Sequence, residues 1–220
     1  MNILITGAFG FVGSNLSSAF KTGLNCRLIA LDVIEPEKHL YDSFLNWQQV
    51  ENIHDLSLNA IIHLAGKAHD TKNTTDEKVY FDVNLGLTKQ IFDCFLRSSA
   101  EKFIFFSSVK AVADKVDGAQ LEENVIPDPQ SPYGKSKLAA ENYILSQKLP
   151  PNKKVYIIRP CMIHGPGNKG NLNLLYNIVQ KKIPWPLGRF HNLRSFTSID
   201  NLSFGIIQIL NKEIAAGVYN

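Results

Sequence analysis

The amino-acid sequence predicts an α/β fold of the doubly wound type, with a parallel sheet covered by helices on both faces. Short apolar runs without in–out alternation recur along the chain, as expected of buried parallel strands. Helical patterns separate these runs, which gives the alternation of strand and helix typical of this class. With 220 residues, of which 45% are hydrophobic and 20% charged, the chain is long enough to bury such a sheet.

The elements follow in order along the chain. The apolar runs predict strands at residues 2–6, 26–32, 60–65, 102–108 and 154–160, and helical patterns cover 11–21, about 75–99 and about 132–148. Ser131 and Pro132 fit the N-cap and first position of the last helix. Between "NWQQV" and "AIIHLAG" the expected helix is nearly absent, and "AAGVYN" at the end predicts the start of another strand.

Charge and cysteine content exclude several classes of protein. The formal charge of +3 is spread along the chain, which does not indicate nucleic-acid or membrane binding. The three cysteines form no CxxC pair and the histidines lack metal-ligand spacing, so we expect free thiols and no metal. No apolar run approaches the ~18 residues of a membrane span, and the first strand leaves no room for a signal peptide. We therefore expect a cytoplasmic protein.

Three glycines punctuate the first strand-to-helix turn, in "TGAFGFVG" at residues 6–13. Gly7 would permit the tight turn, Gly10 the approach of a pyrophosphate, and Gly13 close packing of helix on strand. The helix that starts near Phe11 would direct its free N–H groups at the phosphates. Glycines are common at turns, so the spacing alone leaves a plain turn as the alternative.

Asp32 ends the second predicted strand, where the acidic partner of an adenosine ribose is expected. A carboxylate there accepts hydrogen bonds from both ribose hydroxyls and repels a 2′-phosphate. The sequence therefore predicts NAD rather than NADP. A simple turn residue is the alternative.

Tyr133 and Lys137 lie four residues apart in a predicted helix, so their side chains share one face. A lysine ammonium and an oxidised nicotinamide would both favour the phenolate of Tyr133, as a general base requires. A pair at this spacing is also typical of a solvated helix face. Ser108, which follows the strand in "FIFFSS", completes a Ser–Tyr–Lys set and favours the catalytic interpretation.

These motifs together resemble the nucleotide-sugar epimerase/dehydratase family of extended short-chain dehydrogenases/reductases, which have a Rossmann-type fold. The resemblance runs from residue 1 to 220 and includes "TGAFGFVG", the Ser–Tyr–Lys set, "HLAG" at 63–66, "VNLGLT" at 83–88 and "RPCMIHGPG" at 159–167. It implies an NAD-binding Rossmann domain at 1–160. It also implies a partial, apparently truncated substrate-binding region at 161–220, interleaved with the Rossmann fold.

The resemblance also implies roles for individual residues. NAD would be bound by Gly7, Phe9, Gly10, Phe11, Val12, Gly13, Asp32, Leu64, Ala65, Gly66, Asn84, Tyr133, Lys137 and Pro160. The nucleotide sugar would contact Ser108, Lys110, Asn171, Leu187 and Arg194, although loop capping and core packing also account for Asn171 and Leu187. His63 is expected to be structural rather than a base.

The implied activity is 4-epimerisation of a UDP-hexose through a 4-keto intermediate. Val109 and Lys110 stand where dehydratases of the family carry an Asp–Glu pair, which argues against dehydration. "SSVK" resembles a bacterial subgroup of UDP-glucose and UDP-N-acetylglucosamine 4-epimerases that act in surface polysaccharide biosynthesis. A 4-keto reductase and a non-catalytic NAD-binding protein stay open. For residues 1–220 alone we expect NAD binding with poor turnover.

Association into a homodimer is expected as well. The helices at about 75–99 and 132–148 carry apolar residues on more than one face, and in relatives the equivalent helices pair around a twofold axis. The apolar residues are Phe81, Ile91, Phe92, Phe95, Leu138, Tyr143 and Leu145.

Overall fold

A seven-stranded parallel sheet forms the centre of the computed structural model, in the order β3-β2-β1-β4-β5-β6-β9. The model describes the chain except residues 69–75, 117, 119, 123, 169–170 and 183–192, and leaves out the side chains of 171, 173 and 174. The strands are β1 (Asn2–Thr6), β2 (Arg27–Asp32), β3 (Ser43–Asn46), β4 (Ala60–His63), β5 (Lys102–Phe106), β6 (Lys154–Ile158) and β9 (Gly217–Tyr219). This is the predicted doubly wound, Rossmann-type order.

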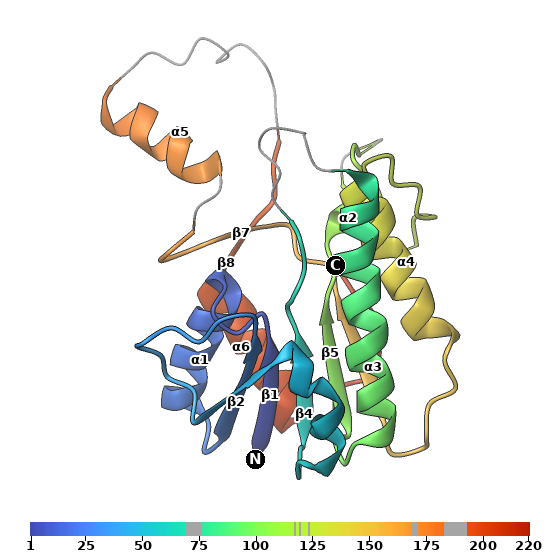
Figure 1. Cartoon of the computed structure of the whole chain (residues 1–220). Coiled ribbons are helices and arrows are strands. Elements are labelled where there is room, and N and C mark those ends of the chain that lie inside the picture. The colour runs from blue at the N-terminus through green and yellow to red at the C-terminus, as the bar shows by residue number, and fades with distance from the viewer. Residues whose placement is uncertain (69–75, 117, 119, 123, 169–170, 183–192) are drawn as a thin grey trace.

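Helices cover both faces of the sheet, as Figure 1 shows. On one side lie α1 (Phe11–Gly23) and α6 (Ile199–Asn211), and on the other lie α2 (Glu77–Phe81), α3 (Leu87–Arg97) and α4 (Pro132–Ser146). Phe20 and Ile206 pack in the first layer, and Phe92 and Phe103 pack in the second. Because both faces are covered, the strands carry continuous apolar runs instead of alternating ones.

The predicted helix at 75–99 is interrupted. A π-helical turn, η2 (Asp82–Gly86), separates α2 from α3 and includes the buried Asn84. Such turns occur often at functional sites. The expectation of almost no helix before β4 is wrong, because the 3₁₀ helix η1 (Trp47–Asp55) forms there and buries Val50 and Ile53.

The segment after β6 contains elements that the sequence pattern did not reveal, apart from the predicted final strand, which is β9. Strands β7 (Met162–His164) and β8 (Phe196–Ser198) form a separate parallel pair, and α5 (Asn171–Gln180) stands away from the sheet in Figure 1. Because α6 packs under the sheet and β9 extends it, this segment contributes to the central domain. Among the described residues, no helix combines the length and apolar character needed to cross a bilayer.

Candidate functional site

The glycine turn lies at the carboxyl end of β1, between the ends of β2 and β4. Gly7 adopts a φ of +63°, a left-handed conformation that glycine accepts without strain, and its N–H donates to Leu31 O at 2.9 Å. A β-carbon at Gly7 would lie 2.8 Å from the backbone nitrogen of Ala65. The turn therefore requires a glycine both for its conformation and for its contact with the next loop.

Gly10 and Gly13 shape the start of α1. Gly10 is the N-cap and contributes no side-chain cap, which leaves the first N–H groups of the helix available to a ligand. A β-carbon at Gly13 would lie 2.7 Å from Gly7 O and closer still to Ala8 O, so the helix packs directly on the turn. The geometry at Gly7 and Gly13 fits a tight turn and close helix packing, and the approach of a pyrophosphate at Gly10 stays a prediction.

Tyr41 supports the turn from below, and sequence analysis missed it. Its buried hydroxyl lies 3.0 Å from Ala8 O and 2.9 Å from Gly13 O, within donating distance of both carbonyls. Burial raises the pKa of the phenol, so it remains a donor at neutral pH. Nothing in the local sequence around Tyr41 signals this contact, because its partners lie some thirty residues away.

Asp32 lies at the end of β2 and reaches the glycine turn. Its Oδ2 accepts the N–H of Phe9 at 2.9 Å, and its Oδ1 accepts the N–H of Val33 at 2.8 Å. The side chain remains partly exposed at the carboxyl edge of the sheet. A carboxylate in this place can still accept hydrogen bonds from ribose hydroxyls while it holds the turn in shape.

Ser108 and Tyr133 meet at the same edge. Ser108 follows β5 and caps the short helix η3 (Val109–Ala111), and Tyr133 lies in the first turn of α4. Burial raises the pKa of Tyr133, the hydrogen bond between the Tyr133 and Ser108 side chains lowers it, and the nearby Tyr80 raises it. Tyr80 meets Tyr133 edge to face, with ring centroids 6.4 Å apart, and is a second residue that sequence analysis missed.

Lys137 lies one turn further along α4 and is 4% exposed. Its ammonium donates to Phe106 O at 2.8 Å and lies 4.9 Å from the ring centre of Phe105. Burial lowers its pKa to about 8, and the charge of Glu141 opposes that shift. In the structure the Lys137 ammonium donates to the Phe106 carbonyl, and its predicted effect on the phenolate of Tyr133 stays a prediction.

Leu64, Ala65 and Gly66 form the loop after β4, which Asn84 holds from below. The Asn84 side chain accepts the Lys67 N–H at 2.7 Å and donates to Lys67 O at 3.1 Å. Asn84 is fully buried. The structure thus gives Asn84 the task of shaping this loop.

A buried ion pair lies close to Lys137 and Pro160 along the chain. Glu141 on α4 accepts from Arg159 Nη2 at 2.6 Å and Nε at 3.0 Å, and it also accepts the Ser107 hydroxyl. Each partner lies beside a predicted site residue along the chain or the helix: Ser107 precedes Ser108, Arg159 precedes Pro160, and Glu141 follows Lys137 by one turn. Sequence analysis missed this cluster, because its members come from three separate segments: the end of β5, α4 and the end of β6.

The predicted substrate residues are less defined. Lys110 is exposed and lies 3.6 Å from Asp114, whose carboxylate also accepts the Ser131 hydroxyl at the start of α4. Arg194 is exposed just before β8. Leu187 and the Asn171 side chain lie outside the described residues. Among the described residues, no group of three His, Cys, Asp or Glu side chains could hold a metal ion.

A family model for the NAD dependent epimerase/dehydratase family matches residues 3–220. The chain belongs to this family. NAD is therefore the cofactor that the family assigns to the chain, and the turn, the open start of α1 and Asp32 offer the donors and acceptors that a dinucleotide needs.

Relatives within the family include named 4-epimerases. The chain is 31% identical to UDP-glucose 4-epimerase of Vibrio cholerae, over 98% of this chain and 68% of the relative. It is 29% identical to N-acetyl-alpha-D-glucosaminyl-diphospho-ditrans,octacis-undecaprenol 4-epimerase of Escherichia coli O157:H7, over 100% of this chain and 66% of the relative. The chain thus spans about two thirds of the length of these curated relatives.

Solved structures show the same fold. The whole chain superposes on 77% of UDP-glucose 4-epimerase of Thermus thermophilus in complex with NAD, with a TM-score of 0.82 and 23% identity. It also superposes on 76% of UDP-glucuronic acid 4-epimerase of Bacillus cereus in complex with UDP-glucuronic acid and NAD, with a TM-score of 0.80 and 23% identity. At this level of identity, the likeness of the chain to these structures concerns the fold.

Proposed function

We propose that this chain is the NAD-binding and catalytic part of a nucleotide-sugar 4-epimerase that acts on a UDP-hexose. The observation that carries the proposal is the proximity of the Ser108 and Tyr133 side chains, one helical turn from Lys137, at the sheet edge that holds the glycine turn. The names of the relatives, which include two 4-epimerases, support the same reaction class. A role in surface polysaccharide biosynthesis belongs to this proposal.

Each member of the Ser–Tyr–Lys set has a distinct task. Tyr133 takes the proton of the sugar 4-hydroxyl, and Ser108 hydrogen-bonds the same oxygen as its charge changes. Bound NAD supplies the hydride acceptor and the positive ring that favours a phenolate. Lys137 has further N–H donors beyond the one given to Phe106 O, and these suit the ribose of the cofactor. The 4-keto sugar then receives the hydride on its other face.

The substrate side rests on residues of two regions. We assign residues 1–160 to NAD binding and 161–220 to part of the substrate region, with Arg194 on the diphosphate, because an exposed guanidinium suits bidentate binding of phosphate oxygens. Asn171 and Leu187 are proposed as further contacts. Lys110, close to Ser108, is proposed to reach the sugar.

The decisive experiment replaces Tyr133 by phenylalanine. The ring still packs but cannot take a proton, so UDP-glucose should no longer reduce bound NAD, and epimerisation should fall by a factor of about 100 or more. The readouts are NADH absorbance after mixing with UDP-glucose, and formation of UDP-galactose. The reduction step reports on Tyr133 even if turnover of residues 1–220 is slow.

Tyr143→Phe is the matched control. It removes a phenol hydroxyl from the same helix, but that hydroxyl donates to Asp93 on α3. With this variant, UDP-glucose should reduce bound NAD as it does with the wild type. Normal reduction by Tyr133→Phe would contradict the proposal, provided that calorimetry shows unchanged NAD binding.

A 4-keto reductase is the second candidate. A relative that is 26% identical is named GDP-6-deoxy-D-mannose reductase. Such an enzyme would consume a reduced cofactor, and it would not interconvert UDP-glucose and UDP-galactose. Failure of every UDP-hexose to reduce bound NAD, with NAD binding intact, would favour this reductase or a non-catalytic NAD-binding protein.

We also propose a homodimer, on a narrower surface than the sequence suggested. Ile91, Phe92 and Phe95 are fully buried against the sheet, so they are not available to a partner. The exposed apolar side chains on this side are Val79 on α2 and Leu145 on α4. A monomer by light scattering at micromolar concentration would contradict a dimer.

A further inference from the structure

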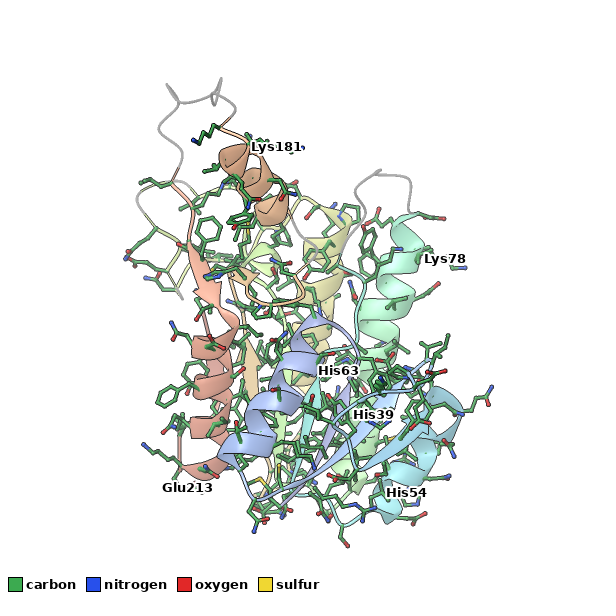
Figure 2. All side chains as sticks on the ribbon, turned by 90° about the vertical axis from the view of Figure 1, so that its left-hand side faces the viewer. His39, His54, His63, Lys78, Lys181 and Glu213 are labelled. Carbon is green, nitrogen blue, oxygen red and sulfur yellow. The ribbon has the colours of Figure 1, made fainter. Side chains whose placement is uncertain are left out.

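Five polar side chains form a fully buried hydrogen-bond chain between the sheet and the catalytic helix. They come from β1, β4, the π turn, α3 and α4, and each is 0% exposed: Thr6, His63, Asn84, Thr88 and Ser136. Figure 2 shows His63 in the interior, away from the labelled residues at the periphery such as Lys181 and Glu213. Buried polar groups are tolerated when they are all satisfied, and such networks specify one arrangement of their surroundings.

The direction of the bonds can be assigned at the β1 end. The Thr6 hydroxyl oxygen accepts the Ala65 N–H at 3.1 Å and shares the Leu64 N–H, at 3.2 Å, with its own carbonyl. Its hydrogen is therefore available to His63 Nδ1, 2.7 Å away. If Nδ1 carried a proton, that proton would meet an oxygen already occupied by donors. His63 is thus neutral and protonated on Nε2.

The bonds continue from His63 into the π turn. Nε2 donates to the Thr88 hydroxyl at 2.9 Å, which donates to Asn84 O at 2.6 Å. The Asn84 side chain accepts the Lys67 N–H and donates to Lys67 O. It also donates to the Ser136 hydroxyl at 2.9 Å. Ser136 in turn donates to Tyr133 O at 2.8 Å.

The loop after β4 depends closely on this arrangement. A β-carbon on Gly66 would lie 2.9 Å from Asn84 Oδ1 and 3.2 Å from Lys137 Nζ, so the loop backbone passes close to both the amide and the ammonium. A shift of Asn84 by about half an ångström would therefore disturb both the loop and the surroundings of Lys137. Precision of this order decides whether a bound group is held productively.

We propose that His63 is a positioning residue which, through Thr88 and Asn84, fixes the cofactor-facing loop against the turn of α4 that carries Tyr133 and Lys137. The proposal rests on the proposed function for the assignment of Tyr133 and Lys137. His63 is 0% exposed, so its side chain is not placed to touch a bound cofactor or substrate. It acts by orienting the π turn.

The first test reads the protonation of His63 directly in the wild-type chain. Nitrogen NMR of the chain, labelled on histidine, should show His63 as a single neutral tautomer with hydrogen on Nε2 and a bare Nδ1. The assignment uses a His63→Gln spectrum, from which that signal is missing. A protonated Nδ1 in the folded chain would overturn the proposed direction of the bonds, and with it the positioning role.

The second test compares isosteric variants of Thr88. Thr88→Val keeps the shape but removes the hydroxyl, and NAD affinity by calorimetry should fall about tenfold, which corresponds to ~1.4 kcal/mol. Thr88→Ser keeps the hydroxyl and should restore the wild-type affinity. Thr22→Val is the control, because the exposed Thr22 hydroxyl bonds only its own helix in the described structure.

The outcomes separate this proposal from the proposed function. Equal NAD affinity in the wild type, Thr88→Val and Thr88→Ser would overturn positioning while it leaves the NAD site intact. Loss in both Thr88 variants would also overturn it, because the hydroxyl would then not be the cause. No NAD binding by the wild type would overturn both. Backbone NMR shifts of Lys67 and Tyr133 that change in Thr88→Val but not in Thr88→Ser would support the proposed route.

Discussion

The carboxylate of Asp32 holds the shape of the glycine turn, and we expect it also to decide the choice between NAD and NADP. Its Oδ2 accepts the Phe9 N–H at 2.9 Å, and the group remains partly exposed at the carboxyl edge of the sheet, where we expect the adenosine ribose. A 2′-phosphate at this position would meet a negative charge and receive no cation in return.

NAD should therefore bind at least about tenfold more tightly than NADP, a difference of ~1.4 kcal/mol or more. Asp32→Ala should narrow this ratio and weaken NAD binding, since it also releases the turn. Asp32→Asn retains an acceptor for Phe9 and should narrow the ratio with a smaller loss of NAD affinity. Calorimetry with both cofactors measures this, and equal affinities in the wild type would contradict the role of the charge.

At the scale of elements, the contact between α1 and the glycine turn has no room for a side chain. A β-carbon on Gly13 would lie 2.7 Å from Gly7 O, whereas one on Gly205 in α6 would meet no atom within 4 Å beyond its chain neighbours and the backbone of its own helix. Gly13→Ala should therefore destabilise the chain and abolish NAD binding. Gly205→Ala should instead stabilise it by about 0.5–1 kcal/mol, the usual gain in a helix. Urea denaturation measures the stability of both variants, and calorimetry measures their NAD binding. Wild-type stability and NAD affinity in Gly13→Ala would show that the turn can shift to accept a side chain.

The buried pair of Glu141 and Arg159 ties α4 to the end of β6. Glu141 is 0% and Arg159 6% exposed, so removal of one partner leaves an unpaired charge without water. Arg159→Met should lower the free energy of unfolding by about 3–5 kcal/mol. A Glu141→Leu/Arg159→Met double variant should lose less than the sum of the single losses. The exposed Arg97 pairs with Glu51 at 2.8 Å, and Arg97→Met should leave the urea midpoint unchanged.

Local patterns explain why some of these elements were predictable. The strands of the sheet other than β3, and the cap of α4, depend on neighbouring residues, so apolar runs and "SP" at 131–132 were enough to predict them. The interruption at Asn84 was not predictable, because it depends on bonds to Lys67 and Ser136 from elsewhere in the chain. Tyr41, Tyr80 and Glu141 were missed for the same reason. Strand β3 is short and only half-buried, so it lacked an apolar run.

At the scale of the whole molecule, two buried bases make stability depend on pH. Burial, with the charge of Lys137, holds the pKa of His63 well below 6.5, and burial lowers that of Lys137 from 10.5 to about 8. Below about pH 6.5, His63 takes up a proton in the unfolded chain but stays neutral in the folded chain. Between about pH 8 and 10.5 the unfolded chain retains a proton that folded Lys137 releases. In both ranges the unfolded state binds more protons, so the free energy of unfolding rises with pH.

Urea denaturation across pH should therefore show a loss of stability below about pH 6.5, with a contribution from His63 of up to ~1.4 kcal/mol per pH unit. His63→Phe should flatten this acid limb relative to the wild type, and Lys137→Met should flatten the rise above pH 8. Because each variant alters one limb, each serves as the control for the other. Identical acid limbs in the wild type and His63→Phe would contradict a neutral His63.

The hydrogen bonds from Tyr41 to the glycine turn also limit where the chain can be re-engineered. Tyr41 and Asp42 are the last two residues of the connection from β2 to β3. Tyr41 hydrogen-bonds the glycine turn, and Asp42 forms an ion pair with Lys21 at 2.7 Å. Val33 and Ile34, in contrast, expose 72% and 75% of their surface. Insertions, deletions or grafted segments that alter cofactor preference should therefore be confined to residues 33–38. The end of the connection next to β3 must keep its length, because the Tyr41 hydroxyl has to reach the carbonyls of the glycine turn.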